Sequence, residues 1–130
     1  MSDLCERLQD ANEAGTYRLS CPLAVLEANV ALSGMLLIDV DMAAVHSKGE
    51  FLAAMAQALR APDWFGLNWD ALADVLGDLS WLPAGGYVLL LHGDERLGLN
   101  DADYAIVNDM FSEAVSYWKS QGKPFWVFFT

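Results

Sequence analysis

Apolar segments of two kinds alternate along the chain. Short stretches rich in apolar or branched residues predict strands at residues 16–20, 35–41, 86–93 and 125–129. Segments with helical spacing or helix-end signals predict helices at residues 22–34, 47–60, 68–79 and 100–121. Strands that alternate with helices favour an α/β fold with a small, mainly parallel sheet of three to four strands. Because three of these strands are apolar throughout, helices are expected to cover the sheet.

Residues at the predicted helix ends support these boundaries. Pro22 suits a first helical turn and Gly34 a C-terminal cap. Ser47 and Glu50 have the spacing of a capping box. Asn68 is a good N-cap for the next helix. The polar residues 1–14 are expected to form a loose or helical arm, and the direction of the strand at 16–20 stays open.

Composition fits one domain with a packed core. The chain has 130 residues, of which 55% are hydrophobic, and no apolar run approaches the length of a membrane span. The N-terminus lacks the basic and apolar segments of a secretory signal, so a cytoplasmic location is expected. Cys5 and Cys21 have no metal-like spacing and are expected to be reduced. No cofactor is expected.

The chain is strongly acidic, with 18 acids, 7 bases and a formal net charge of −11. Such a charge repels nucleic acid and anionic membranes, and it attracts basic proteins. No basic residue lies between Arg60 and Arg96, whereas six acids do. The middle of the chain therefore lacks the mixed charges of an ordinary solvated surface.

The predicted helix 68–79 concentrates this charge. Asp70, Asp74 and Asp78 follow one another at four-residue spacing, which places them in one stripe. Aspartate is a poor helix former, and like charges at this spacing repel each other. The opposite side is apolar and is expected to be buried; it comprises Trp69, Leu72, Val75, Leu76 and Leu79. A locally unfavourable stripe without basic neighbours favours a surface kept acidic for a partner, with an ordinary exposed face as the alternative.

The chain has five tryptophans, and three of them lie within or close to this helix in the sequence. Trp64 lies in the preceding loop, where an exposed aromatic side chain beside charges is typical of a binding hot spot. The other four tryptophans are expected to pack in the core: Trp69, Trp81, Trp118 and Trp126.

The stretch PDWFGLNWDALADVLGDLSWLP resembles the signature of the barstar family, the intracellular inhibitors of barnase-type ribonucleases. The matching positions are Pro62, Asp63, Trp64, Phe65, Gly66, Asn68, Trp69, Asp70, Ala71, Leu72 and Asp74. The resemblance implies a barstar-like domain at residues 35–130. Residues 1–34 would be an extension with an extra strand and helix packed on that domain.

The resemblance also implies a binding site for a basic ribonuclease or nuclease toxin, in an immunity or antitoxin role. Members of the family place helix carboxylates where RNA phosphates would lie. The resemblance therefore implies Asp74 as the main phosphate mimic and Asp70 as its partner. The implied site also includes Trp64, Gly66, Asn68 and, on the later helix, Glu113. The free protein would be a monomer without enzymatic activity.

Three departures leave the target open. Ala73 and Leu79 stand where the family has tryptophans, and Trp64 stands for a tyrosine. A barstar-like domain that binds a different basic protein is therefore one alternative. Paired carboxylates also occur in glycosidases and Mg²⁺ sites, but there they usually face a cleft from separate elements. Self-association through exposed tryptophans is a third alternative, which the like charges of the stripe oppose.

Overall fold

A computed structural model describes residue 5 and residues 7–62, 66–93 and 96–130. Its elements follow the predicted order of strands and helices. They are β1 (Thr16–Arg18), α1 (Leu23–Leu32), β2 (Leu36–Asp41), α2 (Lys48–Ala58), α3 (Trp69–Leu76), β3 (Tyr87–His92), α4 (Asp101–Ser120) and β4 (Phe125–Phe129).

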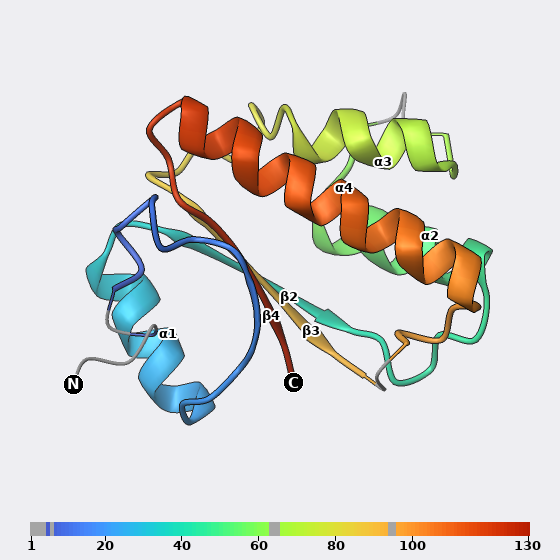
Figure 1. Cartoon of the computed structure of the whole chain (residues 1–130), viewed down its shortest axis with the longest axis horizontal. Coiled ribbons are helices and arrows are strands. Elements are labelled where there is room, and N and C mark those ends of the chain that lie inside the picture. Colours follow the sequence, from blue (N-terminus) through green and yellow to red (C-terminus); the bar gives the residue numbers. More distant parts are fainter. Residues whose placement is uncertain (1–4, 6, 63–65, 94–95) are drawn as a thin grey trace.

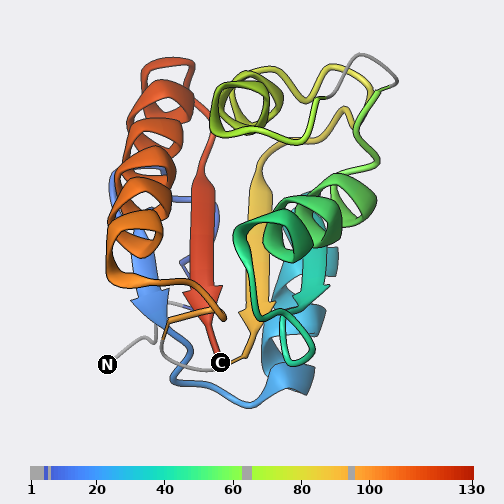
Figure 2. The ribbon, with the colours of Figure 1, turned by 90° about the vertical axis from the view of Figure 1, so that its right-hand side faces the viewer.

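The four strands form one sheet in the order β1-β4-β3-β2, and every neighbouring pair is parallel. Figure 2 shows the strands side by side with their arrows pointing the same way. The predicted α/β fold with a small parallel sheet is therefore confirmed. The short strand at the N-terminal end of the chain, whose direction the sequence left open, lies at one edge and runs parallel to β4.

Helices cover both faces of the sheet, with α2, α3 and α4 on one face and α1 on the other (Figure 1). Alternate residues of the strands point into two separate cores. Leu89 and Val127 face α2–α4, whereas Val88, Leu90 and Trp126 face α1. This arrangement explains why the inner strands are apolar throughout. No helix in the described ranges is long and apolar enough to cross a membrane.

The predicted helix starts are confirmed, but α3 is shorter than predicted. Asn68 caps α3 through its side chain, and the helix ends at Leu76 with Gly77 as its C-cap. Leu79 then adopts a left-handed backbone conformation, with φ of 53°, and is fully buried. The chain leaves the helix early because Leu79 turns into the core. Asp78 therefore lies beyond the helix, and the predicted stripe of three aspartates is wrong for its last member.

The N-terminal segment differs from its prediction in two ways. Residues 7–14 form turns, and Leu8 is buried with 1% of its surface exposed, so this part of the predicted arm is neither loose nor α-helical. Cys5 and Cys21 form a disulfide, so the expectation of reduced thiols is wrong. Cys5 is buried in the core beneath α1 and the partly buried Cys21 packs against this core, a proximity that their sequence spacing does not reveal. The division of the chain at residue 34 stays a prediction.

Candidate functional site

The N-terminal end of α3 is fixed by its cap and by Trp69. The side chain of Asn68 accepts a hydrogen bond from the backbone N–H of Ala71 at 2.8 Å. The ring of Trp69 packs against Phe51 of α2, with 5.9 Å between the ring centres. The Lys48 ammonium lies 5.2 Å from the centre of the same ring. The half-buried Trp69 therefore anchors the helix, as its sequence position predicts.

Tryptophan side chains from elsewhere in the chain hold the far end of α3 and the region around it. The indole N–H of Trp118 in α4 donates to the carbonyl of Leu76 at 2.8 Å. This carbonyl belongs to the last helical residue, which lacks a partner within the helix. The indole N–H of Trp81 donates to the carbonyl of Leu59 at 2.9 Å. Core packing is thus confirmed for the four tryptophans that the sequence assigned to it, since Trp126 is also fully buried.

The hydrogen-bonded ends leave a rigid helix that displays two carboxylates. Asp70 and Asp74 are both exposed and lie one turn apart. Neither carboxylate makes a hydrogen bond or ion pair with another described residue. Asp70 is in the first turn, where the helix dipole favours negative charge, whereas Asp74 is in the last turn, where the dipole opposes it. The charge of Asp74 is therefore available to a partner, although it lowers the stability of the helix.

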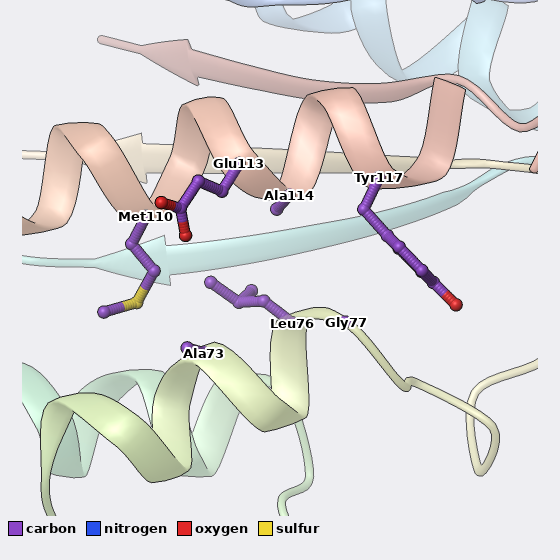
Figure 3. Close-up of a pocket in the computed structure, with 7 residues that line it drawn as sticks. All are labelled: Ala73, Leu76, Gly77, Met110, Glu113, Ala114 and Tyr117. Carbon is purple, nitrogen blue, oxygen red and sulfur yellow. The ribbon is translucent and has the colours of Figure 1, made fainter. Parts of the chain in front are cut away.

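Glu113 brings a third carboxylate to this side of the molecule. It is exposed on α4, and Figure 3 shows it above Ala73 of α3. Between the two helices lies a hollow of about 180 Å³ that both residues line. The other lining residues are Leu76, Gly77, Met110, Ala114 and Tyr117. The structure thus places Glu113 beside the acidic helix, and its contact with a partner stays a prediction.

The loop before α3 contributes two of the predicted site residues. Trp64 lies outside the described residues. Gly66 is exposed, and a Cβ atom at this position would lie 3.1 Å from the side-chain nitrogen of Asn68. Glycine therefore lets the loop pass close to the residue that caps α3.

A buried tyrosine supports the segment that follows α3. The hydroxyl of Tyr87 in β3 donates to the carbonyl of Leu82 at 2.8 Å. Burial raises the pKa of Tyr87 above its usual value, and the negative charge of Asp78 adds to this rise, although a backbone hydrogen bond with Ala84 opposes it. Asp78 lies beyond the end of α3, and its charge helps to raise the pKa of the buried Tyr87 behind the site.

The histidines form no catalytic or metal-binding group with these residues. His92 ends β3, and its Nε2 atom lies 2.6 Å from a carboxylate oxygen of Asp39 on the neighbouring strand. His46 is exposed before α2. No group of three histidine, cysteine or acidic side chains suited to a metal occurs in the part of the chain that the structure describes.

The structure brings together Asp70, Asp74 and Glu113 on adjacent helices. Sequence reasoning missed the hollow beside them, because Met110 and Tyr117 come from another helix. The available signal was Ala73, a small residue where the family signature has a large one. Leu79, the other departure of this kind, is fully buried and therefore contributes nothing to the exposed surface.

Comparisons with known proteins agree with the motif around α3. The sequence profile of a protein family described as Barstar (barnase inhibitor) matches residues 35–130. The match covers the chain from the start of β2 to its end and leaves out β1 and α1. A comparison with curated proteins finds no match.

Proposed function

The chain belongs to the Barstar family of barnase inhibitors, and from this premise we propose that it binds a basic ribonuclease of the barnase type and blocks its active site. The observation that carries the proposal is the exposure of Asp70 and Asp74 on a helix that is fixed at both ends. Neither carboxylate has a cationic partner among the described residues.

The proposed mechanism is phosphate mimicry. A site that binds the RNA backbone presents arginine, lysine and histidine side chains. Asp74 would take the place of a phosphate among these cations, and Asp70 would bind beside it through charge-assisted hydrogen bonds. Glu113 would contact the enzyme from α4, and Trp64 from the loop. Asn68 and Gly66 would shape the loop and the helix start.

Rigidity and charge both favour this mode of binding. A helix whose ends are already hydrogen-bonded loses little conformational freedom on binding. The net charge of −11 attracts a basic partner over the distance that salt does not screen, so association should slow as the salt concentration rises. The inhibitor would act in the cytoplasm as an immunity protein or antitoxin.

The test is an RNA cleavage assay with barnase and related basic ribonucleases. The wild-type protein is expected to inhibit at least one of them, and Asp74→Ala is expected to lose that inhibition. Glu27→Ala is the matched control, because Glu27 is an exposed acid on α1, which covers the opposite face of the sheet. Inhibition that survives Asp74→Ala would refute phosphate mimicry by this residue.

A second candidate function is binding of another basic protein. The hollow at Ala73 favours it, because the family signature carries a tryptophan there and the contact surface therefore differs. This candidate predicts that no barnase-type ribonuclease is inhibited, while a basic protein still binds and loses affinity with Asp74→Ala. RNA turnover or other catalysis that needs Asp70 in the absence of a protein partner would contradict both candidates.

A further inference from the structure

The hollow between α3 and α4 has an apolar floor. Leu76, Met110 and Ala114 form this floor, and each has at most 7% of its surface exposed. Figure 3 shows Met110 and Tyr117 extending from α4 at the two ends of the hollow, with Ala73 on the α3 side. Glu113 adds the only side-chain carboxylate among the lining residues. The space exists because Ala73 carries a single methyl group.

The size of the hollow fits one aromatic ring. Its volume is about 180 Å³, and an apolar cavity of roughly 150 Å³ in a protein interior is large enough to hold benzene. The thioether of Met110 makes favourable contacts with aromatic rings, and the ring of Tyr117 offers a second such surface. A ring in this position would therefore find suitable partners on several sides.

A buried cation fits the hollow less well than a ring. A guanidinium group carries five N–H donors, and each needs an acceptor once water is removed. The carbonyl of Leu76 already accepts from Trp118, and the carbonyl of Ala73 accepts from the N–H of Gly77. Among the lining side chains, the carboxylate of Glu113 can accept a pair of N–H groups and the hydroxyl of Tyr117 one more, so a buried guanidinium would still keep two donors without a side-chain partner. A hydroxyl or an indole N–H needs only one acceptor.

The hollow lies beside the proposed inhibitory surface. Ala73 follows Asp70 by three residues, so their side chains are neighbours on the helix surface, and it directly precedes Asp74 in the sequence. We propose that the hollow receives an aromatic side chain, a tyrosine or a tryptophan, from the basic partner that Asp70 and Asp74 bind. This inference rests on the proposed function. It gives Ala73 a role in choosing among basic partners, because only a partner that carries the ring would fill the space.

A small-molecule titration tests the chemistry of the hollow without any partner. The probes are p-cresol, which has the side chain of tyrosine, and propylguanidinium, which has the end of an arginine. The signal is the NMR resonance of the Met110 methyl group. We expect p-cresol to shift it saturably at millimolar concentration, propylguanidinium to give no saturable shift, and Ala73→Leu to remove the p-cresol response. A saturable propylguanidinium shift, an absent p-cresol shift, or one that survives Ala73→Leu would overturn the proposal.

Binding to a ribonuclease tests the role of the hollow in the complex. For any ribonuclease that the wild-type protein inhibits, Ala73→Trp should weaken inhibition at least tenfold by filling the space. Ala31→Trp, which adds the same ring to the exposed surface of α1 on the opposite face of the sheet, should stay within threefold of wild type. Unchanged or tighter binding by Ala73→Trp would contradict an incoming ring. If the wild-type protein inhibits no ribonuclease, the proposed function fails, and the p-cresol titration still decides whether the hollow takes a ring.

Discussion

Replacing Asp74 with alanine is expected to stabilise the free protein and to weaken its complex with a ribonuclease. Asp74 is exposed in the last turn of α3 and makes no hydrogen bond or ion pair with another described residue. Asp70 lies one turn before it and carries the same charge. The low helix propensity of aspartate, repulsion by Asp70 and the helix dipole therefore oppose Asp74. No hydrogen bond or ion pair within the described ranges offsets them.

The size of the gain follows from these three features. Alanine is a better helix former than aspartate by up to about 0.7 kcal/mol. Repulsion between like charges one turn apart costs about 0.2–0.5 kcal/mol. A negative charge near the C-terminal end of a helix costs about 0.3–1 kcal/mol. The free protein should therefore gain about 1–2 kcal/mol. Asp74→Asn, which removes only the charge, should gain about 0.5–1.5 kcal/mol.

Asp70 provides the matched comparison. It sits in the first turn of α3, where the dipole favours its charge by about as much as repulsion and helix propensity oppose it. Asp70→Ala should therefore change the free energy of unfolding by less than about 0.5 kcal/mol. Both substitutions should weaken binding, because a charge-assisted hydrogen bond contributes about 1.5–3 kcal/mol.

The assay combines urea denaturation of the free variants with inhibition of the target ribonuclease. The electrostatic part of the Asp74 gain should shrink in 1 M salt, where charges are screened within roughly 3 Å. A loss of stability of more than about 0.5 kcal/mol for Asp74→Ala would refute the reasoning. Such a loss would mean that Asp74 supports the fold, and its effect on inhibition could then not be assigned to the contact.

Three further predictions concern the supports of the site and the N-terminal segment. Trp118→Phe removes the hydrogen bond to Leu76 and leaves a buried carbonyl without its partner, so urea denaturation should show a loss of about 2 kcal/mol. Replacing Cys5 and Cys21 with serine should lower the free energy of unfolding by about 3 kcal/mol, which is the stabilisation expected from a disulfide that closes a loop of this length. Inhibition should stay within threefold of wild type, because α1 covers the face of the sheet opposite α3. Burial raises the pKa of Tyr87 above 10.0, so the unfolded state loses this proton first as the pH rises. Stability should therefore be unaffected by this group below about pH 10 and fall above it, and Tyr87→Phe should reduce that fall in denaturation measured from pH 9 to 11.

The order of elements could be predicted because local signals agreed with the tertiary fold. The Ser47–Glu50 capping box forms, and Asn68 caps α3 as its position predicts. The continuous apolar strands correctly indicated a sheet covered on both faces. These features depend on residues that are close in the sequence, so the amino-acid sequence alone is enough to predict them.

Features that depend on distant residues could not be predicted in this way. The disulfide needs the turns at residues 7–14 to bring Cys5 under α1, and nothing in a spacing of 16 residues encodes that contact. The early end of α3 follows from the burial of Leu79. Helical periodicity correctly predicts that Leu79 faces the core, but it does not predict the left-handed backbone conformation of this residue. The hollow needs α4 to cross beside Ala73. In each case tertiary packing decides the outcome.

The two faces of the sheet divide the roles of the chain. The carboxylates and the hollow lie on the α2–α4 side, whereas α1 and the turns before β1 pack on the other side (Figure 1). They cover Val88, Leu90, Trp126 and Phe128, and the indole N–H of Trp126 donates to the carbonyl of Leu8 at 2.8 Å. Without this cover, a large apolar surface and a buried donor would face water. We therefore infer that the described residues before β2 complete the second core and contribute to stability, while the partner is chosen on the opposite face.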